Sequence, residues 1–117
     1  MGKKIKCIVK RPDEQFGHMT WVSDSLENLQ KTVGGYIETV TLDNGVVLIC
    51  NEEGKLRDMP YNFSALCSAH AYDAYVEWRE QLFGTVIVCG TNPTKDTFAD
   101  IPIDFNEWKA LLCEWGN

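Results

Sequence analysis

The sequence predicts an α+β fold, with a mostly antiparallel sheet and helices packed on one face of it. Three features lead to this prediction: two capping-box patterns, a double glycine that ends the first helix, and short β-branched runs bounded by turn residues. The chain has 117 residues, of which 44% are hydrophobic, enough to bury one proper core. We therefore expect a single domain over residues 1–117.

The first part of the chain predicts two strands. Lys4–Lys10 alternates between basic and apolar side chains, which is typical of a half-buried strand. Pro12-Asp13-Glu14 then interrupts the pattern, because proline and acidic residues favour a turn. The segment His18–Ser23 follows as a short return strand.

A helix is expected next. Asp24 is the predicted N-cap, and Glu27, three residues on, completes a capping box. Gly34-Gly35 ends the helix, since glycine adopts the left-handed conformation of a C-terminal cap at little cost. The apolar residues that would share its buried face are Leu26, Leu29 and Val33.

The following segment predicts a hairpin. Residues 36–42 alternate, and Asp43-Asn44-Gly45 supplies a two-residue turn, because Asn-Gly suits the positive φ angles of a type I′ turn. Val46–Cys50 is nearly all apolar and β-branched, which indicates a central strand buried on both faces. Asn51-Glu52-Glu53-Gly54 forms the next turn.

The second half completes the architecture. Residues 63–83 are expected to form one or two helices, an insertion-like segment that ends at Gly84. A buried strand over 84–90 and a loop over 91–102 follow. Asp104 and Glu107 form a second capping box before an amphipathic final helix. Three tryptophans are expected mainly in the core, with an exposed one serving as an interface anchor: Trp78, Trp108 and Trp115.

The segment from Leu26 to about Pro60 carries the pattern LxxLQxxVGGYIExVxLxxGxxLICNEEGK. It resembles an uncharacterised domain-of-unknown-function family that is common in phages, plasmids and other mobile elements of Gram-positive bacteria. The likeness returns more weakly at residues 84–90 and in the C-terminal helix, whereas residues 63–83 are longer and richer in aromatics than is usual. No catalytic residues of that family carry over. The resemblance implies a small accessory protein of a mobile element.

Charge is distributed unevenly along the chain. The net charge is −6; five of the 11 basic residues lie within the first eleven positions, and all 17 acidic residues follow them. An acidic body of this kind repels nucleic acid and is attracted to basic surfaces, although ordinary solubility also explains such a charge. We expect a protein partner with a basic surface and no direct binding of nucleic acid.

The compartment is expected to be the cytosol. The apolar run after the first lysines, Ile5–Val9, is too short for a signal peptide, and no apolar run approaches the roughly 20 residues that span a bilayer. Five cysteines form an odd number, and Cys7, Cys50 and Cys89 lie in apolar runs. We therefore expect reduced thiols that act as small hydrophobic side chains.

Cys67 and His70 are the candidate metal ligands. Three residues apart, they would share one face of the expected helix and could contribute to a structural zinc site. Zinc needs four ligands, so Cys50, Cys89, Cys113 or His18 would have to complete the set. The alternative is a buried cysteine beside an unrelated histidine. A Cys–His nucleophilic dyad is disfavoured, because no third orienting group and no oxyanion hole is visible.

Glu52, Glu53 and Asp58 are the candidate partner-binding residues. The Asn51–Gly54 turn lacks the alternating ligand spacing of a calcium loop, so an exposed acidic turn is the better interpretation. Its carboxylates would meet basic residues of a partner. The glycines form no phosphate loop, because the GK[ST] ending is missing.

Two classes of function follow from these observations. The first is a non-enzymatic phage or mobile-element protein that binds and inhibits a host defence protein, most concretely an anti-CRISPR that blocks a nucleic-acid-binding nuclease effector. The second is a small-molecule binder that sequesters a nucleotide signal, with Lys55 and Arg57 near its phosphates. A housekeeping accessory domain of a mobile element is a third interpretation. No cofactor is required by any of them.

Overall fold

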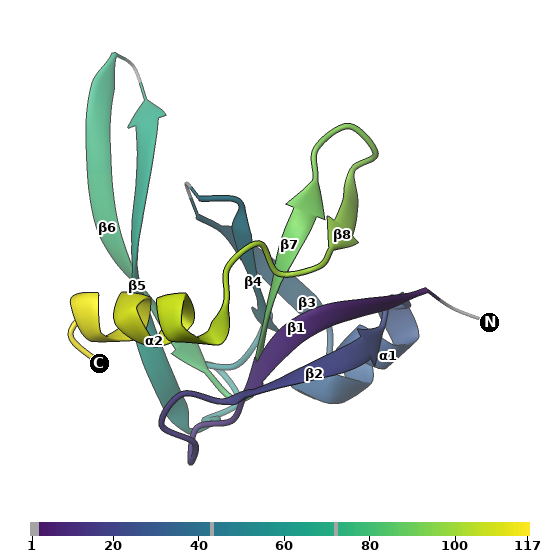
Figure 1. The fold of residues 1–117 in the computed structure, drawn as a ribbon. Coiled ribbons are helices and arrows are strands. Elements are labelled where there is room, and N and C mark those ends of the chain that lie inside the picture. Colours follow the sequence, from purple (N-terminus) through teal and green to yellow (C-terminus); the bar gives the residue numbers. More distant parts are fainter. Residues whose placement is uncertain (1–2, 43, 72) are drawn as a thin grey trace.

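The computed structural model describes residues 3–42, 44–71 and 73–117, except for the side chains of His70 and Ala71. It confirms the α+β class: a mostly antiparallel structure with two helices (Figure 1). The elements in chain order are β1 (Lys4–Lys10), β2 (His18–Ser23), α1 (Leu26–Val33), β3 (Ile37–Thr41), β4 (Val46–Asn51), β5 (Tyr61–Ala71), β6 (Ala74–Phe83), β7 (Val86–Asn92), β8 (Thr97–Ala99) and α2 (Phe105–Glu114). None of the helices among these residues is long and apolar enough to cross a bilayer.

The strands form two sheets. The larger has the order β2-β1-β7-β4-β3, with β8 paired to β7, and every pairing is antiparallel. The smaller is the two-stranded β5–β6 hairpin, which rises beyond the rest of the molecule (Figure 1). Strand β4 lies between β3 and β7, and all six of its residues are buried, as its unbroken apolar run predicts.

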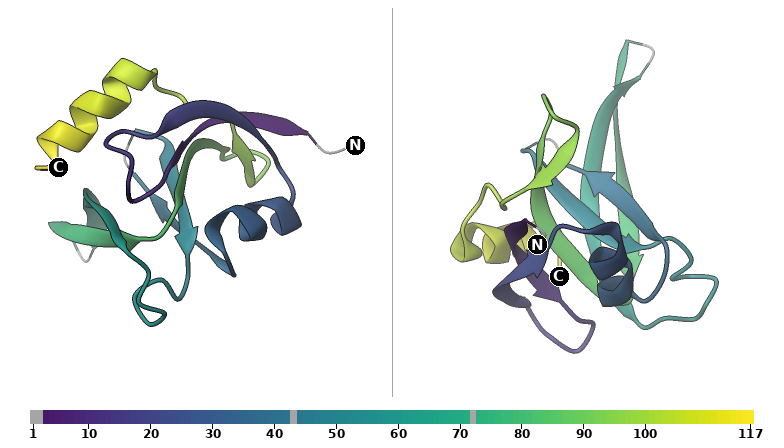
Figure 2. Two further views of the ribbon diagram at one scale, coloured as in Figure 1. Left: turned by 90° about the horizontal axis from the view of Figure 1, so that it is seen from below. Right: turned by 90° about the vertical axis from the view of Figure 1, so that its right-hand side faces the viewer.

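The two helices lie on opposite faces of the larger sheet, which corrects the expectation of helices on one face (Figure 2). Alternation along β4 is the physical reason, because successive side chains point to opposite faces. Val47 and Ile49 join the cluster that contains Leu29 and Val33 of α1. Three other side chains of β4 join the cluster that contains Trp108 and Leu112 of α2: Val46, Leu48 and Cys50.

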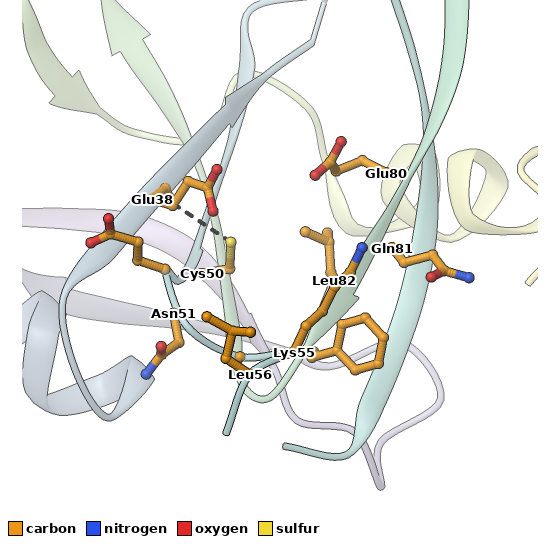
Figure 3. Close-up of a pocket in the computed structure, with 11 residues that line it drawn as sticks. Glu38, Cys50, Asn51, Lys55, Leu56, Glu80, Gln81 and Leu82 are labelled. Atoms are coloured by element: carbon orange, nitrogen blue, oxygen red, sulfur yellow. Dashed lines mark hydrogen bonds between the residues drawn. The ribbon is translucent and has the colours of Figure 1, made fainter. Parts of the chain in front are cut away.

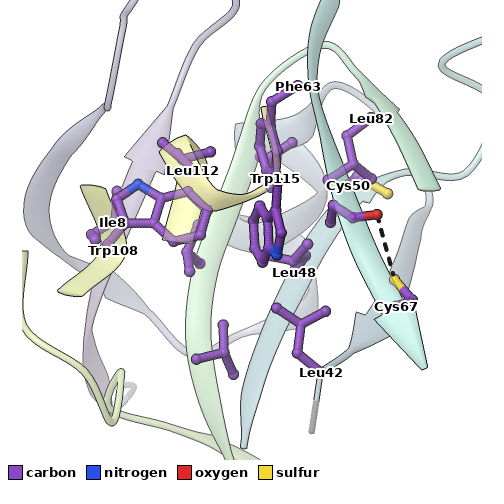
Figure 4. Packing of buried hydrophobic residues seen from close by; sticks show 14 of the residues in the cluster. Ile8, Leu42, Leu48, Cys50, Phe63, Cys67, Leu82, Trp108, Leu112 and Trp115 are labelled. Carbon is purple, nitrogen blue, oxygen red and sulfur yellow. Dashed lines mark hydrogen bonds between the residues drawn. The ribbon is translucent and has the colours of Figure 1, made fainter. Parts of the chain in front are cut away.

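The α2 side holds the larger core (Figure 4). Trp108 is fully buried, its indole N–H donates to the carbonyl oxygen of Phe16 at 2.8 Å, and its ring meets Phe63 edge to face. Trp115 stacks on Phe63 with the ring centroids 6.2 Å apart. The base of β5 is therefore fixed against α2 by three aromatic rings. Two of the three tryptophans expected in the core are there, whereas Trp78 is 42% exposed.

The prediction of one or two helices over residues 63–83 is wrong. These residues form most of β5 and β6, paired from Phe63 with Leu82 to Ala71 with Ala74. The buried positions at the start of β5 repeat every second residue, a strand period, and the approximate helical spacing of other apolar residues was coincidental. The buried residues in that repeat are Phe63, Ala65 and Cys67.

Local signals placed several other boundaries well, although β7 begins and ends two residues later than predicted and β8 lies within the expected loop over 91–102. The second capping box is present, with Asp104 accepting from the Glu107 amide at 2.8 Å. The first helix is capped one residue later than expected: Ser25 is its N-cap and accepts from the Asn28 amide at 3.2 Å. Gly34 is the C-cap, with φ 84°. Gly45 has φ 83°, but the predicted two-residue turn includes Asp43, which lies outside the described residues.

Candidate protein-interaction site

The three predicted partner-binding carboxylates lie in the connection between β4 and β5. Glu52, Glu53 and Asp58 are all exposed. Asp58 has φ 53°, a left-handed conformation that aspartate tolerates better than most residues. The structure therefore brings all three to the surface of one short connection.

Asn51 holds this connection against the end of α1. It is 5% exposed, its side-chain amide donates to the Val33 carbonyl oxygen at 3.2 Å, and its side-chain oxygen accepts from the Glu53 amide at 2.7 Å. The Glu52 amide donates to the Tyr36 carbonyl oxygen at 2.9 Å. Gly35 leaves room for this arrangement, because a Cβ there would lie 2.8 Å from the Asn51 side chain. The backbone that carries both glutamates is thus held by hydrogen bonds on each side.

The nearby basic side chains contact groups of this chain other than the three carboxylates. Arg57 donates to the Gly34 carbonyl oxygen at 3.0 Å, and the Lys55 ammonium lies over the Phe83 ring at 5.7 Å. Within the described part of the chain, the only ion pair joins Glu14 to His18. The carboxylates at this surface therefore form no ion pair with any basic side chain that the structure describes.

A cleft of about 260 Å³ lies beside the connection, between the larger sheet and β6 (Figure 3). Glu38 of β3 and Glu80 of β6 face it from opposite sides, and Leu82 and Lys55 lie on the Glu80 side. Glu52 also lines it. The cleft combines an apolar floor with carboxylates at its margin, an arrangement suited to the aliphatic stem and cationic head of lysine or arginine.

Cys50 lies in this cleft but is poorly suited to chemistry. Its thiol is 5% exposed and contacts the Glu38 carbonyl oxygen at 3.7 Å. Burial, reinforced by the charges of Glu38 and Glu80, raises the pKa of Cys50 to about 11. The thiol is therefore protonated at neutral pH, and only the thiolate is a good nucleophile or metal ligand.

The structure removes the geometric basis for the zinc prediction at Cys67 and His70. The prediction placed both residues on one helix face, but they belong to strand β5, where positions three apart lie on opposite faces. Cys67 is buried, and the side chain of His70 lies outside the described residues. Among the described side chains, no group of three or more histidine, cysteine, aspartate or glutamate residues could hold a metal.

The residues that were considered as completing ligands do not form one group, because only Cys50 shares a core cluster with Cys67. Cys89 belongs to the cluster on the α1 face, whereas Cys67 and Cys50 belong to the cluster on the α2 face. His18 contacts Glu14 at 2.8 Å. Cys113 is exposed, and all five cysteines are free thiols. Four of the five are buried, as expected for cysteine acting as a small hydrophobic side chain.

Sequence reasoning missed two carboxylates of the site, Glu38 and Glu80. Glu80 was assigned to a helix, so its position across a cleft from β3 could not be foreseen. The signal that could have found Glu80 is the burial of every second residue at the start of β5. That repeat predicts a strand, with a second strand paired to it in a hairpin after Asp73. Reasoning also missed that Lys10 is buried: its ammonium donates to the Asn62 side chain at 2.5 Å, and burial lowers its pKa below the usual 10.5.

The fold is a small α+β domain with a two-sided central sheet and an acidic cleft beside a projecting hairpin. The chain belongs to the domain of unknown function DUF3846, whose family model matches residues 5–112. The matched range spans both helices except the last two residues of α2, and it spans the whole β5–β6 hairpin. No curated protein and no solved structure matches the chain.

Proposed function

We propose that this protein is a non-enzymatic binding protein that docks its acidic surface on a basic surface of another protein. The observation that carries the proposal is the set of uncompensated carboxylates around a preformed cleft. Lys55 and Arg57 contact a ring and a carbonyl oxygen, and no described basic side chain forms an ion pair with Glu52, Glu53 or Asp58, so these carboxylates can pair with cations of a partner. Complementary charge of this kind accelerates association and selects the partner.

The most concrete form of this function is inhibition of a host defence protein. A nuclease effector that binds nucleic acid has a groove rich in lysine and arginine, and an acidic domain that occupies the groove excludes the nucleic acid. The resemblance of residues 26–60 to proteins of phages and mobile elements supports this setting, with an anti-CRISPR as its clearest example. The inhibitor would act in the cytosol of the host cell and would need no catalysis.

Capture of a partner tests the proposal. Tagged protein is incubated with lysate from a bacterium rich in defence systems, and the retained proteins are identified by mass spectrometry. We expect one dominant basic nuclease or nuclease subunit. Recovery should fall at least about tenfold for the E52K/E53K/D58N variant, since several attractive charges become neutral or repulsive. Asparagine replaces Asp58 because it tolerates the left-handed backbone there.

A matched control separates this site from general charge. The D13N/E27K/E114K variant makes the same change in net charge at exposed carboxylates elsewhere and should retain the partner. Equal loss with both variants would contradict the proposed site, and retention of no partner by the wild type would contradict the proposed function. The purified partner then permits a nuclease assay and a phage-protection assay, both of which inhibition requires.

One observation favours a small-molecule binder as the second candidate. A hollow of about 330 Å³, within the usual size range for ligand pockets, lies where Tyr36, 69% exposed, and Arg57 meet. An exposed aromatic ring beside a guanidinium can stack a base and contact a phosphate. Glu53 also lines the hollow and would repel that phosphate, which makes this function the weaker one. Thermal unfolding with a panel of nucleotides tests it, because a ligand that binds the folded state raises the melting temperature.

A further inference from the structure

The outer half of the β5–β6 hairpin lacks a supporting layer. The hairpin projects beyond the larger sheet in Figure 1 and in the right-hand view of Figure 2, and residues 74–79 of its second strand are all exposed. A two-stranded sheet is marginally stable in water, and three or more strands are usually needed. The large apolar side chains exposed on β6 are Tyr75 (56%), Val76 (43%) and Trp78 (42%).

A contact at the base of the hairpin shows which backbone groups of β6 point outward. The Asn117 side chain accepts from the Ser64 amide at 3.1 Å and donates to the Ser64 carbonyl oxygen at 2.8 Å, so the Ser64 backbone points away from β6. The backbone N–H and C=O groups of its cross-strand neighbour, Gln81, then point away from β5. By alternation, the backbone groups of Tyr75, Glu77 and Arg79 also point to the outer edge of β6.

This outer edge is suited to strand pairing. Among the described residues no strand pairs with it, since β6 belongs to a two-stranded sheet with β5. Proteins usually protect long edges with charged side chains, especially lysine, or with proline or a bulge. AYVEWREQLF contains neither lysine nor proline, and its charged residues carry both signs. The pairing of β5 with β6 is irregular at the base of the hairpin, between Tyr61 and Phe63.

The charges on β6 complement a second copy of the same strand. Glu77 and Arg79 are exposed, have opposite charge, and lie on either side of Trp78. When two such strands run antiparallel about a two-fold axis at Trp78, each glutamate lies opposite an arginine. The Arg79 guanidinium donates to the Trp115 carbonyl oxygen through one nitrogen, and its other N–H groups remain for a carboxylate.

We propose that the protein forms a symmetric dimer by antiparallel pairing of β6 with β6 of a second copy. In this register Glu77 and the partner's Arg79 form a hydrogen-bonded pair, because both backbones point outward. Trp78 and the partner's Trp78 form the closer, non-hydrogen-bonded pair on the axis, where large side chains contact best. The two hairpins become one four-stranded sheet. The dimer edge adjoins the acidic cleft, since Glu80 and Gln81 of β6 also line that cleft. The dimer proposal does not depend on which partner the cleft binds.

Charge exchange within β6 tests the dimer. Sedimentation velocity of the purified chain over a concentration series should show a monomer–dimer equilibrium. E77R and R79E should each raise the dimer dissociation constant at least about tenfold, because two opposite-charge pairs become like-charge pairs. The E77R/R79E double variant restores both pairs and should return toward wild-type association. An equimolar mixture of the two single variants should form a heterodimer in preference to either homodimer.

Several results would overturn the proposal. One is a wild type that stays monomeric up to about 1 mM, a concentration at which even a weak specific contact is populated. Another is a double variant that associates no better than the single variants. The E27R variant changes an exposed glutamate on α1 and should dimerise as the wild type does. Circular dichroism of each variant checks that the chain is folded, and rescue in the double variant excludes misfolding as the cause.

Discussion

Asn51 is the buried polar side chain on which the candidate site depends. It joins a carbonyl oxygen at the end of α1 to an amide in the acidic connection, two groups that regular secondary structure does not satisfy. A single short side chain thus positions a helix end and a surface turn. At the same scale, Cys7, Cys50 and Cys89 show how strongly the core controls chemistry, since burial is the first cause of each raised pKa.

Replacing Asn51 with alanine should lower the free energy of unfolding by about 1–3 kcal/mol, because two buried backbone groups lose a partner. Denaturant unfolding measures the change. The N106A variant is the matched control: Asn106 is exposed on α2, and its replacement should leave stability within about 0.5 kcal/mol. A loss equally small at both positions would show that Asn51 does not hold the connection.

Stability should fall as the pH rises above 9. Burial raises the pKa of Cys7 to about 11 and of Cys89 to about 12, against 9.0 for an unperturbed thiol. Between these values the unfolded chain has lost protons that the folded chain keeps, so alkali favours unfolding. Urea unfolding at pH 7.5 and pH 10 measures the difference. C89A should show a smaller decrease, and an unchanged decrease would exclude this thiol as a source.

At the scale of elements, local signals predicted most of the fold. Strands β1 and β2 were predicted with their observed bounds, and α2 with its capping box, because alternation and capping depend on neighbours in sequence. The β5–β6 hairpin was missed because its buried repeat includes alanine and cysteine, which are weak apolar signals. The positions of α1 and α2 on opposite faces depend on the strand order, which is a property of distant contacts.

The candidate site shows the same division. Exposed Glu52 and Glu53 were predicted because a turn rich in polar residues identifies itself locally. Glu38 and Glu80 face the same cleft from strands 42 positions apart in sequence, so only the folded chain brings them together. The geometric argument for zinc at Cys67 and His70 depended wholly on an assumed helix, and the structure has a strand there.

The cap of α1 gives a test at this scale. Ser25 accepts the Asn28 amide, so S25A should lower the free energy of unfolding by about 1 kcal/mol, whereas D24A should change it by less than about 0.5 kcal/mol. Thermal or denaturant unfolding of the two variants measures the difference. The reverse order would restore Asp24, the residue that the sequence pattern indicated, as the functional cap.

At the scale of the whole molecule, the distribution of charge bears on whether the protein attracts basic proteins or nucleic acid. Of the five basic residues near the amino terminus, Lys10 is buried against Asn62 and Phe63 and adds little to a surface for phosphates. The rest of the chain is acidic, and the net charge is −6. Long-range attraction therefore favours basic proteins over nucleic acid.

A labelled oligonucleotide, single- or double-stranded, should show no change in fluorescence anisotropy with up to about 100 μM protein, even at low salt where phosphate contacts are strongest. Binding that weakens steeply as salt is added would contradict this expectation. The K4E/K6E variant would then identify the source, because Lys4 and Lys6 are exposed on β1.

The two-sided burial of β4 has a consequence for motion. Its amides lie between two cores and two neighbouring strands, so they can exchange with solvent only when the larger sheet opens as a whole. The outer half of the hairpin is exposed and can open by itself. Hydrogen–deuterium exchange should therefore show a gradient, slowest in β4 and β7 and fastest toward the end of the hairpin. Slowing of that fast region as protein concentration rises would reveal that a second strand has covered it.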